Sequence, residues 1–229
     1  MGKKKKKKTK KKGHLRRFVV RAAIAVVVLS FVLTVPWRWL PPPTSAFMLQ
    51  HRDPVQQRWV PMEKISPWLA IAVVAGEDQR FPLHHGFDFD AISKALREDR
   101  AKLRGASTIT QQLAKNLYLW PGRSFVRKGL EAYFSVLLEL TWPKQRILEV
   151  YLNVVEFGPG IFGAEAASQA FFNRSARQIS TGQAALLAAV LPNPKRYSAR
   201  RPSEYVRQRA TFISQQIKAL GGPGYLFWL

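Results

Sequence analysis

Residues 69–81 read LAIAVVAGEDQRF, an apolar run that ends in two acids and an arginine. Ser66 and Pro67 stand before the run as an N-cap and a first helical residue, so the sequence predicts a buried helix that ends at the two acids. Such a helix carries titratable side chains at one end. The stretch therefore predicts both the centre of a helical core and the position of a chemical site.

Glu77 and Asp78 are the candidates for acid–base chemistry. The alternative is an exposed acidic pair at a helix end. Against it, the negative end of the helix macrodipole and the repulsion between neighbouring carboxylates both raise a carboxyl pKa, as a base working near neutrality requires. His84 and His85 lack the regular His/Glu spacing of a metal site, so we expect one of them to orient the loop.

Charge divides the chain into two parts. The 229 residues carry a formal net charge of +23 from 37 basic and 14 acidic residues, and residues 1–40 hold 13 of the basic residues and no acidic one. The remainder is still distinctly basic. Cysteine is absent from the sequence, which excludes a disulfide framework and a thiolate metal site.

Residues 18–37 form an apolar stretch of 20 residues with one charge, Arg21, near its start. About 20 helical residues cross a bilayer core, and dense lysines before the span place the N-terminus in the cytoplasm. We therefore expect a cytoplasmic polybasic tail at 1–17, a single transmembrane helix at 18–40 in the inner membrane, and a periplasmic remainder. A cleaved signal peptide would have a shorter apolar region and a small-residue cleavage site, and a nucleic-acid-binding tail would not precede a membrane-length span.

After the span, the sequence predicts a Pro-rich spacer and membrane-proximal segment at 41–65 and one all-α domain at 66–229. Hydrophobic periodicity and Gly/Pro breaks divide this domain into helices, and no strand is evident after residue 66. The expected helices cover about 66–78, 88–103, 107–119, 124–140, 143–153, 161–172, 181–191 and 203–220, with a loop at 158–160.

One face of the helix expected at 107–119 is polar. An ordinary solvated face is the alternative reading. The composition of the face, with amides, a hydroxyl and a single cation, suits hydrogen bonding to a sugar or phosphate better than solvation alone. Its members are Thr108, Gln111, Gln112, Lys115 and Asn116.

Arg127 and Glu131 are four residues apart in the helix expected at 124–140, so they share a face. A surface ion pair is the alternative. Phe134 and Leu138 continue the same stripe, which turns the pair inward. A charged pair at the end of an apolar stripe should line a cleft, because burying either charge unpaired is costly. Lys128 adds a second cation beside it.

Together these stretches resemble the family-51 glycosyltransferases, the peptidoglycan polymerases that extend glycan strands from lipid II. The resemblance covers about residues 60–200. Pro82 and Pro159 are unusual choices inside matching loops, and Tyr197 is not followed by the proline that the family commonly has. The matching blocks are Glu77–Phe81 with His84 and Gly86; the highly specific 105–116; Arg127, Lys128 and Glu131 with Lys144, 147–149 and 151–153; 160–167; and 191–194 with Tyr197.

The resemblance implies a lysozyme-like α fold and a monofunctional, membrane-anchored enzyme, since no Ser-x-x-Lys domain follows. It implies an inverting reaction in which a sugar hydroxyl attacks the lipid II donor and undecaprenyl pyrophosphate leaves. Glu77 is expected to be the base, and Glu131 a second catalytic carboxylate that helps to organise the pyrophosphate. The substrate-binding residues implied by the matching blocks are Asp78, Phe81, His84, Ser107, Thr108, Gln112, Lys115, Asn116, Arg127 and Lys128.

This chemistry requires no cofactor. Mg²⁺ or Mn²⁺ bound with the pyrophosphate is compatible with it, and the sequence assigns no metal ligands. The expected partners are the membrane, lipid II with the growing glycan chain, and other proteins of cell-wall synthesis or division, with no nucleic acid. Two alternatives stay open: a lysozyme-like hydrolase, which has no phosphate to hold, and a membrane-tethered basic binding module, which does not explain the clustered acids.

Overall fold

The computed structural model describes residues 2–97, 107–122, 124–227 and 229, and the chain divides into two compact units, Met1–Leu40 and Pro41–Leu229. The first unit consists of α1 (Gly2–Thr34) and a 3-10 turn at Val35–Arg38. The segment Arg16–Arg38 is long and apolar enough to cross a membrane.

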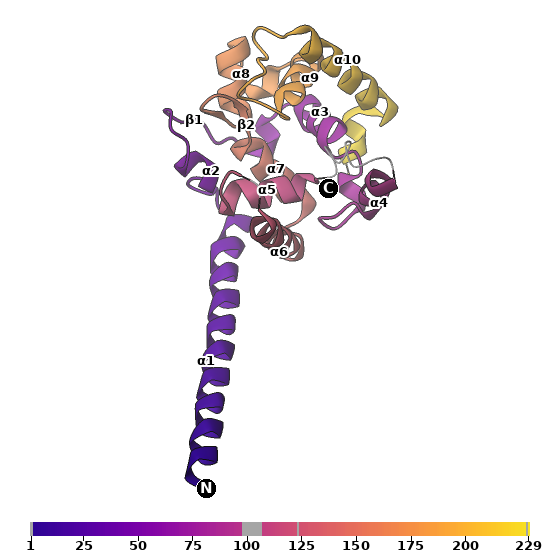
Figure 1. The fold of residues 1–229 in the computed structure, drawn as a ribbon. Helices are drawn as coiled ribbons and strands as arrows, with labels where there is room; N and C mark the ends of the chain where they lie inside the picture. Colours follow the sequence, from indigo (N-terminus) through magenta and orange to yellow (C-terminus); the bar gives the residue numbers. More distant parts are fainter. Residues whose placement is uncertain (1, 98–106, 123, 228) are drawn as a thin grey trace. The chain divides into compact units, whose positions relative to one another are not determined.

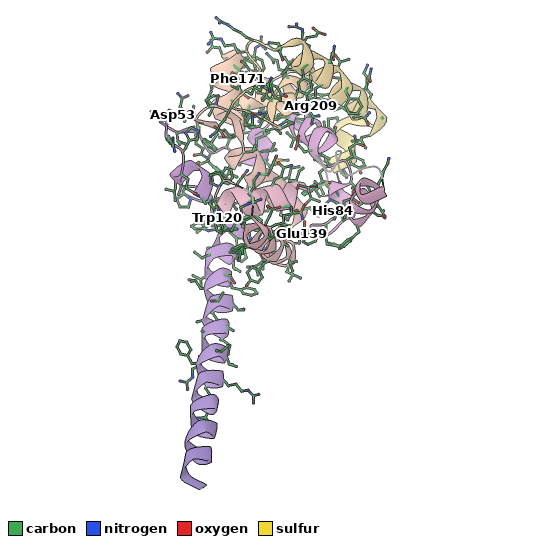
Figure 2. All side chains as sticks on the ribbon, in the orientation of Figure 1. Asp53, His84, Trp120, Glu139, Phe171 and Arg209 are labelled. Atoms are coloured by element: carbon green, nitrogen blue, oxygen red, sulfur yellow. The ribbon has the colours of Figure 1, made fainter. Side chains whose placement is uncertain are left out.

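The apolar side chains of α1 project outward from the helix (Figure 2), and those from Phe18 to Leu33 are exposed. The two hydroxyls of the segment Arg16–Arg38 are satisfied within the helix: Ser30 Oγ donates to the carbonyl of Val27 at 2.7 Å, and Thr34 Oγ1 donates to the carbonyl of Ser30 at 2.8 Å. Internal satisfaction of polar groups is what a helix in lipid requires. The segment is therefore compatible with a membrane anchor.

The second unit is mostly helical, which confirms the expected fold class. Except for α2, a short helix in the segment expected to be a spacer, its α-helices lie close to the ranges predicted from hydrophobic periodicity. They are α2 (Ala46–Leu49), α3 (Pro67–Glu77), α4 (Phe89–Arg97), α5 (Ile109–Tyr118), α6 (Phe125–Thr141), α7 (Lys144–Val154), α8 (Ala164–Phe172), α9 (Thr181–Val190) and α10 (Glu204–Ala219). The expected extension of the second helix to residue 103 lies outside the described residues.

Helix α3 is the centre of the core. Every residue from Leu69 to Ala75 is buried, because α3 packs against α9 and α10 and has no solvent-facing side over this run. At the other end of the unit, α5 packs against α6 and α7 (Figure 1). The C-terminal end of α3 therefore reaches the boundary between these two groups of helices.

A small three-stranded sheet corrects the expectation that no strand follows residue 66. Strands β1 (Gln56–Gln57), β2 (Glu156–Gly158) and β3 (Ile161–Phe162) run in the order β1-β3-β2, with β1 parallel and β2 antiparallel to β3. The residues at 158–160 and 161–162 were expected in a loop and in a helix. Strands of two or three residues are too short for an alternating pattern to stand out in a sequence.

Residues 41–65 pack into the second unit, although the sequence separates them from the domain. Strand β1 pairs with β3, and Val60 is buried. The side chain of Asn153 on α7 holds this segment: its Oδ1 accepts from the Val60 amide at 3.0 Å, and its Nδ2 donates to the Val60 carbonyl at 2.9 Å. Asn153, which belongs to the third matching block, thus has a structural role, because it holds the segment 41–65 against α7.

Candidate active site

Glu77 is the last residue of α3, and its carboxylate is held by side chains from other helices. Gln112 on α5 donates from Nε2 to Glu77 Oε2 at 2.9 Å. Tyr151 on α7 donates its hydroxyl to Gln112 Oε1 at 2.8 Å. Because Tyr151 occupies the amide oxygen of Gln112, the amide nitrogen is left to face Glu77. The orientation of the carboxylate is therefore set through two helices.

The second oxygen of Glu77 faces Arg209 on α10. The Arg209 Nη2 lies 3.4 Å from Glu77 Oε1, and the same nitrogen donates to the carbonyl of Gly76 at 3.2 Å. Only 12% of the Glu77 side chain and 26% of the Arg209 side chain are exposed. Arg209 comes from the helix expected at 203–220, where the sequence predicts no site residue.

Burial raises the pKa of the Glu77 carboxyl above its ordinary value, and this effect exceeds the stabilisation of the charged form by Gln112, Arg209 and Lys115. The direction agrees with the sequence-based expectation. The cause differs, because the dominant effect is loss of solvent rather than repulsion from Asp78.

The loop that follows α3 is supported from the interior by Asp78, Phe81 and His84. Asp78 Oδ1 pairs with His84 Nε2 at 2.9 Å, and Asp78 Oδ2 accepts from the amide of Ile109 at 2.9 Å, at the N-terminus of α5. Phe81 is fully buried. All three were expected to bind substrate. Asp78 lines a pocket beside Glu77 and also joins the end of α3 to the start of α5, whereas His84 and Phe81 are buried in the support of the loop.

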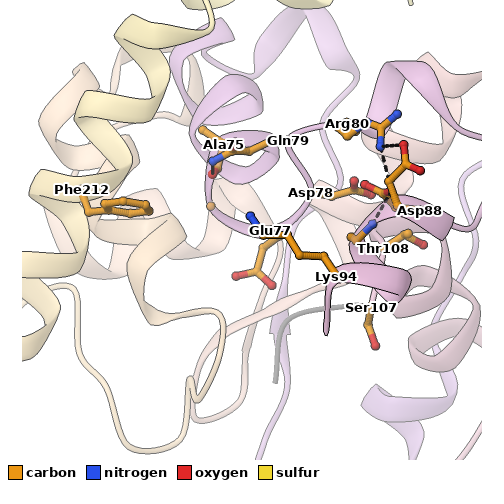
Figure 3. A pocket seen from close by; sticks show the side chains of 13 residues that line it. Ala75, Glu77, Asp78, Gln79, Arg80, Asp88, Lys94, Ser107, Thr108 and Phe212 are labelled. Atoms are coloured by element: carbon orange, nitrogen blue, oxygen red, sulfur yellow. Dashed lines mark hydrogen bonds and ion pairs between the residues drawn. The ribbon is translucent and has the colours of Figure 1, made fainter. Parts of the chain in front are cut away.

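A pocket of about 450 Å³ opens beside Glu77 (Figure 3). Ser107 and Thr108 line it, as expected of binding residues, and Phe212 points toward it from α10. The Thr108 hydroxyl is already engaged, because it caps α5 by accepting from the Gln111 amide and donates to the carbonyl of Gly86 at 2.7 Å. Thr108 is thus the N-cap of α5, and the helix begins two residues later than the expected start at 107.

A second pocket of about 230 Å³ is lined by Gln112, the residue that donates a hydrogen bond to Glu77. It brings together Gln112, Lys115 and Asn116 of α5. The stretch 191–194 and Phe47, from the segment before the domain boundary predicted from the sequence, also line it. Two matching blocks far apart in the sequence therefore meet here, and three residues of the polar face of α5 form part of the pocket wall.

Glu131 on α6 is buried between two cations, as the inward stripe predicts. Arg127 Nη1 lies 2.7 Å from Glu131 Oε2, and Lys128 Nζ lies 2.5 Å from Glu131 Oε1. The side chains of Glu131 and Arg127 are 4% and 11% exposed, whereas that of Lys128 is 49% exposed. Both carboxylate oxygens are therefore occupied by the chain's own cations.

Lys115 connects the two acidic centres electrostatically. Burial lowers the pKa of its ammonium group, and the carboxylates of Glu131 and Glu77 both act against that shift. Lys115 thus lies within the fields of both carboxylates, next to Arg127 and Lys128. The result is a cationic patch near the second pocket, defined here as the buried Lys115 and Arg127 with the half-exposed Lys128.

A protein-held metal does not fit these side chains. Within 2–97, 107–122, 124–227 and 229, no group of three or more His, Asp or Glu side chains converges as metal ligands. Glu131 is the acid closest to the cationic patch, and its oxygens are taken by Arg127 and Lys128. The chain's own cations supply the positive charge at this place.

Arg209, Tyr151 and Phe212 are site residues that the sequence did not reveal as such. Tyr151 belongs to a matching block, but its hydrogen bond to Gln112 depends on how α5 and α7 pack. Arg209 and Phe212 lie in an amphipathic helix whose pattern explains only the packing of its apolar face. Arg209 meets Glu77 across 132 residues of chain, and no local pattern indicates such a contact.

Comparison with known proteins places this arrangement in a family. The transglycosylase family profile matches residues 45–218, which include α3, α5, α6 and α10. A biosynthetic peptidoglycan transglycosylase from Pseudomonas fluorescens is 52% identical over 224 residues, which span 93% of this chain and 93% of that protein. Proteins with the same description from Chromohalobacter salexigens and Xanthomonas euvesicatoria are 51% and 50% identical, over 92% of this chain and 94% and 90% of their own lengths. The chain therefore belongs to the transglycosylase family.

Proposed function

We propose that this protein is a peptidoglycan glycosyltransferase that polymerises lipid II into β-1,4-linked glycan strands and releases undecaprenyl pyrophosphate. The observation that carries the proposal is the position of a buried carboxylate, Glu77, which lines one pocket and is hydrogen-bonded to Gln112, a residue that lines a second pocket together with Lys115 of the cationic patch. Relatives at about half identity along nearly the whole chain are described as biosynthetic peptidoglycan transglycosylases.

Glu77 acts as the general base in this reaction. It removes the proton of the 4-hydroxyl of the acceptor's terminal GlcNAc, and that oxygen attacks C1 of the donor's MurNAc. The bond from C1 to the pyrophosphate oxygen breaks, so the anomeric centre inverts from α to β. A raised carboxyl pKa suits a base that works near neutrality, and the bonds from Gln112 and Arg209 hold the carboxylate in one orientation.

The cationic patch stabilises the leaving pyrophosphate. Lys115, Arg127 and Lys128 offer positive charge where negative charge develops, and the burial of Lys115 and Arg127 strengthens their part of this effect. Glu131 then acts by fixing the positions of Arg127 and Lys128, and not by touching the pyrophosphate itself. No step of this mechanism passes through a metal ion, and a Mg²⁺ or Mn²⁺ ion in this site would be held chiefly by pyrophosphate oxygens.

We further propose that α1 anchors the protein in the inner membrane, with its N-terminus cytoplasmic and the second unit periplasmic. The lipid-linked donor resides in the same membrane. The protein should sediment with membranes, resist extraction by about 1 M salt and dissolve in mild detergent. A folded protein released by salt alone would contradict the anchor, and a soluble form cleaved after residue 40 would identify α1 as a signal sequence.

Purified full-length protein incubated with labelled lipid II should produce glycan chains, and the same protein incubated with finished peptidoglycan should release no fragments. A hydrolase on a similar fold would give the opposite result. A binding module would retain both substrates without changing either. Separation of the products by length, before and after digestion with a muramidase, decides among the three functions.

A further inference from the structure

Helix α10 reaches the catalytic carboxylate through a single charged side chain. The Arg209 guanidinium faces both the carbonyl of Gly76 and Oε1 of Glu77. The buried residues Val206, Ala210, Ile213 and Ile217 hold α10 against the core, so the position of Arg209 is fixed by packing on the adjacent face of the helix. The packing of α10 therefore fixes Arg209 as part of the site.

We propose that Arg209 is a positioning residue that keeps the Glu77 carboxylate ionised and oriented for proton transfer. The proposal rests on the role of Glu77 as the base. Gln112 holds Oε2 and Arg209 faces Oε1, so rotation of the carboxylate would break one contact or the other. A fixed orientation lowers the cost of reaching the transition state, because the base need not be ordered during the reaction.

Among the residues that the structure describes, the cation paired with Glu77 is Arg209. Tyr151 on α7 stays a neutral phenol, since burial raises its pKa well above the ordinary value. Lys115 on α5 acts on Glu77 through its field and is shared with Glu131. Lys94 on α4 lines the same pocket. Removing water from a carboxylate favours its protonated form, and a guanidinium at contact distance opposes that effect most directly.

Arg209 also has a structural contact, because the carbonyl of Gly76 belongs to the last turn of α3 and lacks a helical partner there. A useful test must therefore separate positioning from folding. Arg209→Gln removes the charge and keeps a hydrogen-bonding side chain, and Arg209→Lys keeps the charge without the planar fork. Arg207→Gln is the matched control, because Arg207 lies on the same helix but pairs with Glu204 at the surface.

The measurement is kcat/KM for lipid II polymerisation as a function of pH, with thermal unfolding of each variant alongside. Loss of Arg209 should raise the pKa of Glu77 further, so the rising limb of the profile moves to higher pH. For a shift of about one pH unit, the rate below the limb falls about tenfold, while the rate on the high-pH plateau stays within a few-fold of wild type. In Arg209→Lys the rising limb should lie close to its wild-type pH. The pH profile of Arg207→Gln should match that of wild type.

An equal loss of rate at every pH in Arg209→Gln, with the limb unmoved, would overturn the proposal and assign Arg209 a structural role only. A second readout does not depend on turnover: carbon NMR titration of the side-chain carboxyls of the detergent-solubilised full chain, with Glu77 assigned by its absence in Glu77→Gln. Its titration should move to higher pH in Arg209→Gln. If wild type fails to polymerise lipid II while this shift is observed, the proposed function fails and the electrostatic link between Arg209 and Glu77 stands.

Discussion

Glu77→Gln should lose lipid II polymerisation by ~10²- to 10⁴-fold, which is the usual effect of removing a positioned base. The amide has nearly the same shape as the carboxylate, and its one oxygen can accept a hydrogen bond from either Gln112 or Arg209, but it cannot take a proton. The measurement is the initial rate of glycan chain formation from labelled lipid II. Asp90→Asn is the matched control, because Asp90 lines the same pocket and pairs with Arg80 at the surface; its rate should stay within a few-fold of wild type.

The same variant should be at least as stable as wild type. A carboxyl whose pKa is raised in the folded state stabilises the fold at pH values below its unfolded pKa, and this contribution is lost as pH rises through the folded pKa. At neutral pH the folded protein therefore bears the cost of a buried charge, and the amide removes it. Near-normal turnover by a folded Glu77→Gln protein would remove Glu77 from the mechanism.

Glu131→Gln should both destabilise the protein and slow polymerisation. The substitution leaves Arg127 buried without its negative partner, and breaking a buried ion pair from one side costs about 3 kcal/mol. The two cations also lose the group that fixes their positions, so we expect the rate to fall by ~10²-fold or more. Thermal unfolding and the polymerisation rate, measured below the unfolding range of the variant, report the two effects separately.

Glu149→Gln provides the control for Glu131. Glu149 pairs with Arg146 at 2.8 Å within α7, the two side chains are 15% and 11% exposed, and neither lines the two pockets as the described residues form them. This variant should lose stability while its rate per folded molecule stays near wild type. If both variants lose rate in proportion to their stability, Glu131 has no role beyond folding.

The helices and the main site residues could be predicted from the sequence because their signals are local. The apolar run before Glu77 needs no distant partner to be recognised as a buried helix. The i, i+4 spacing of Arg127 and Glu131 and the apolar stripe that continues it indicate an inward pair within one helix. The polar face of α5 is likewise visible on a helical wheel, and three of its residues line the second pocket.

What the sequence could not predict depends on tertiary packing. The sequence motif marks Asp78 and His84 as binding residues. In the structure, however, one carboxylate oxygen of Asp78 pairs with His84, and the other accepts a hydrogen bond from the backbone at the start of α5. Gln111 shares the polar face of α5, but its side chain closes the helix cap with Thr108. No residue near Arg209 in the sequence indicates that Arg209 contacts Glu77. These polar side chains form hydrogen bonds within the protein, and such bonds are evident only from the folded structure.

The packing of α3 against α9 and α10 has a consequence for the order in which the protein matures on the ribosome. Synthesis proceeds from the N-terminus, so the apolar helix α3 emerges more than 100 residues before the helix that carries Arg209. Until α10 is made and docks, α3 lacks part of its cover and Glu77 lacks its guanidinium partner. The nascent chain therefore completes the surroundings of the Glu77 carboxylate only after α10 has been synthesised.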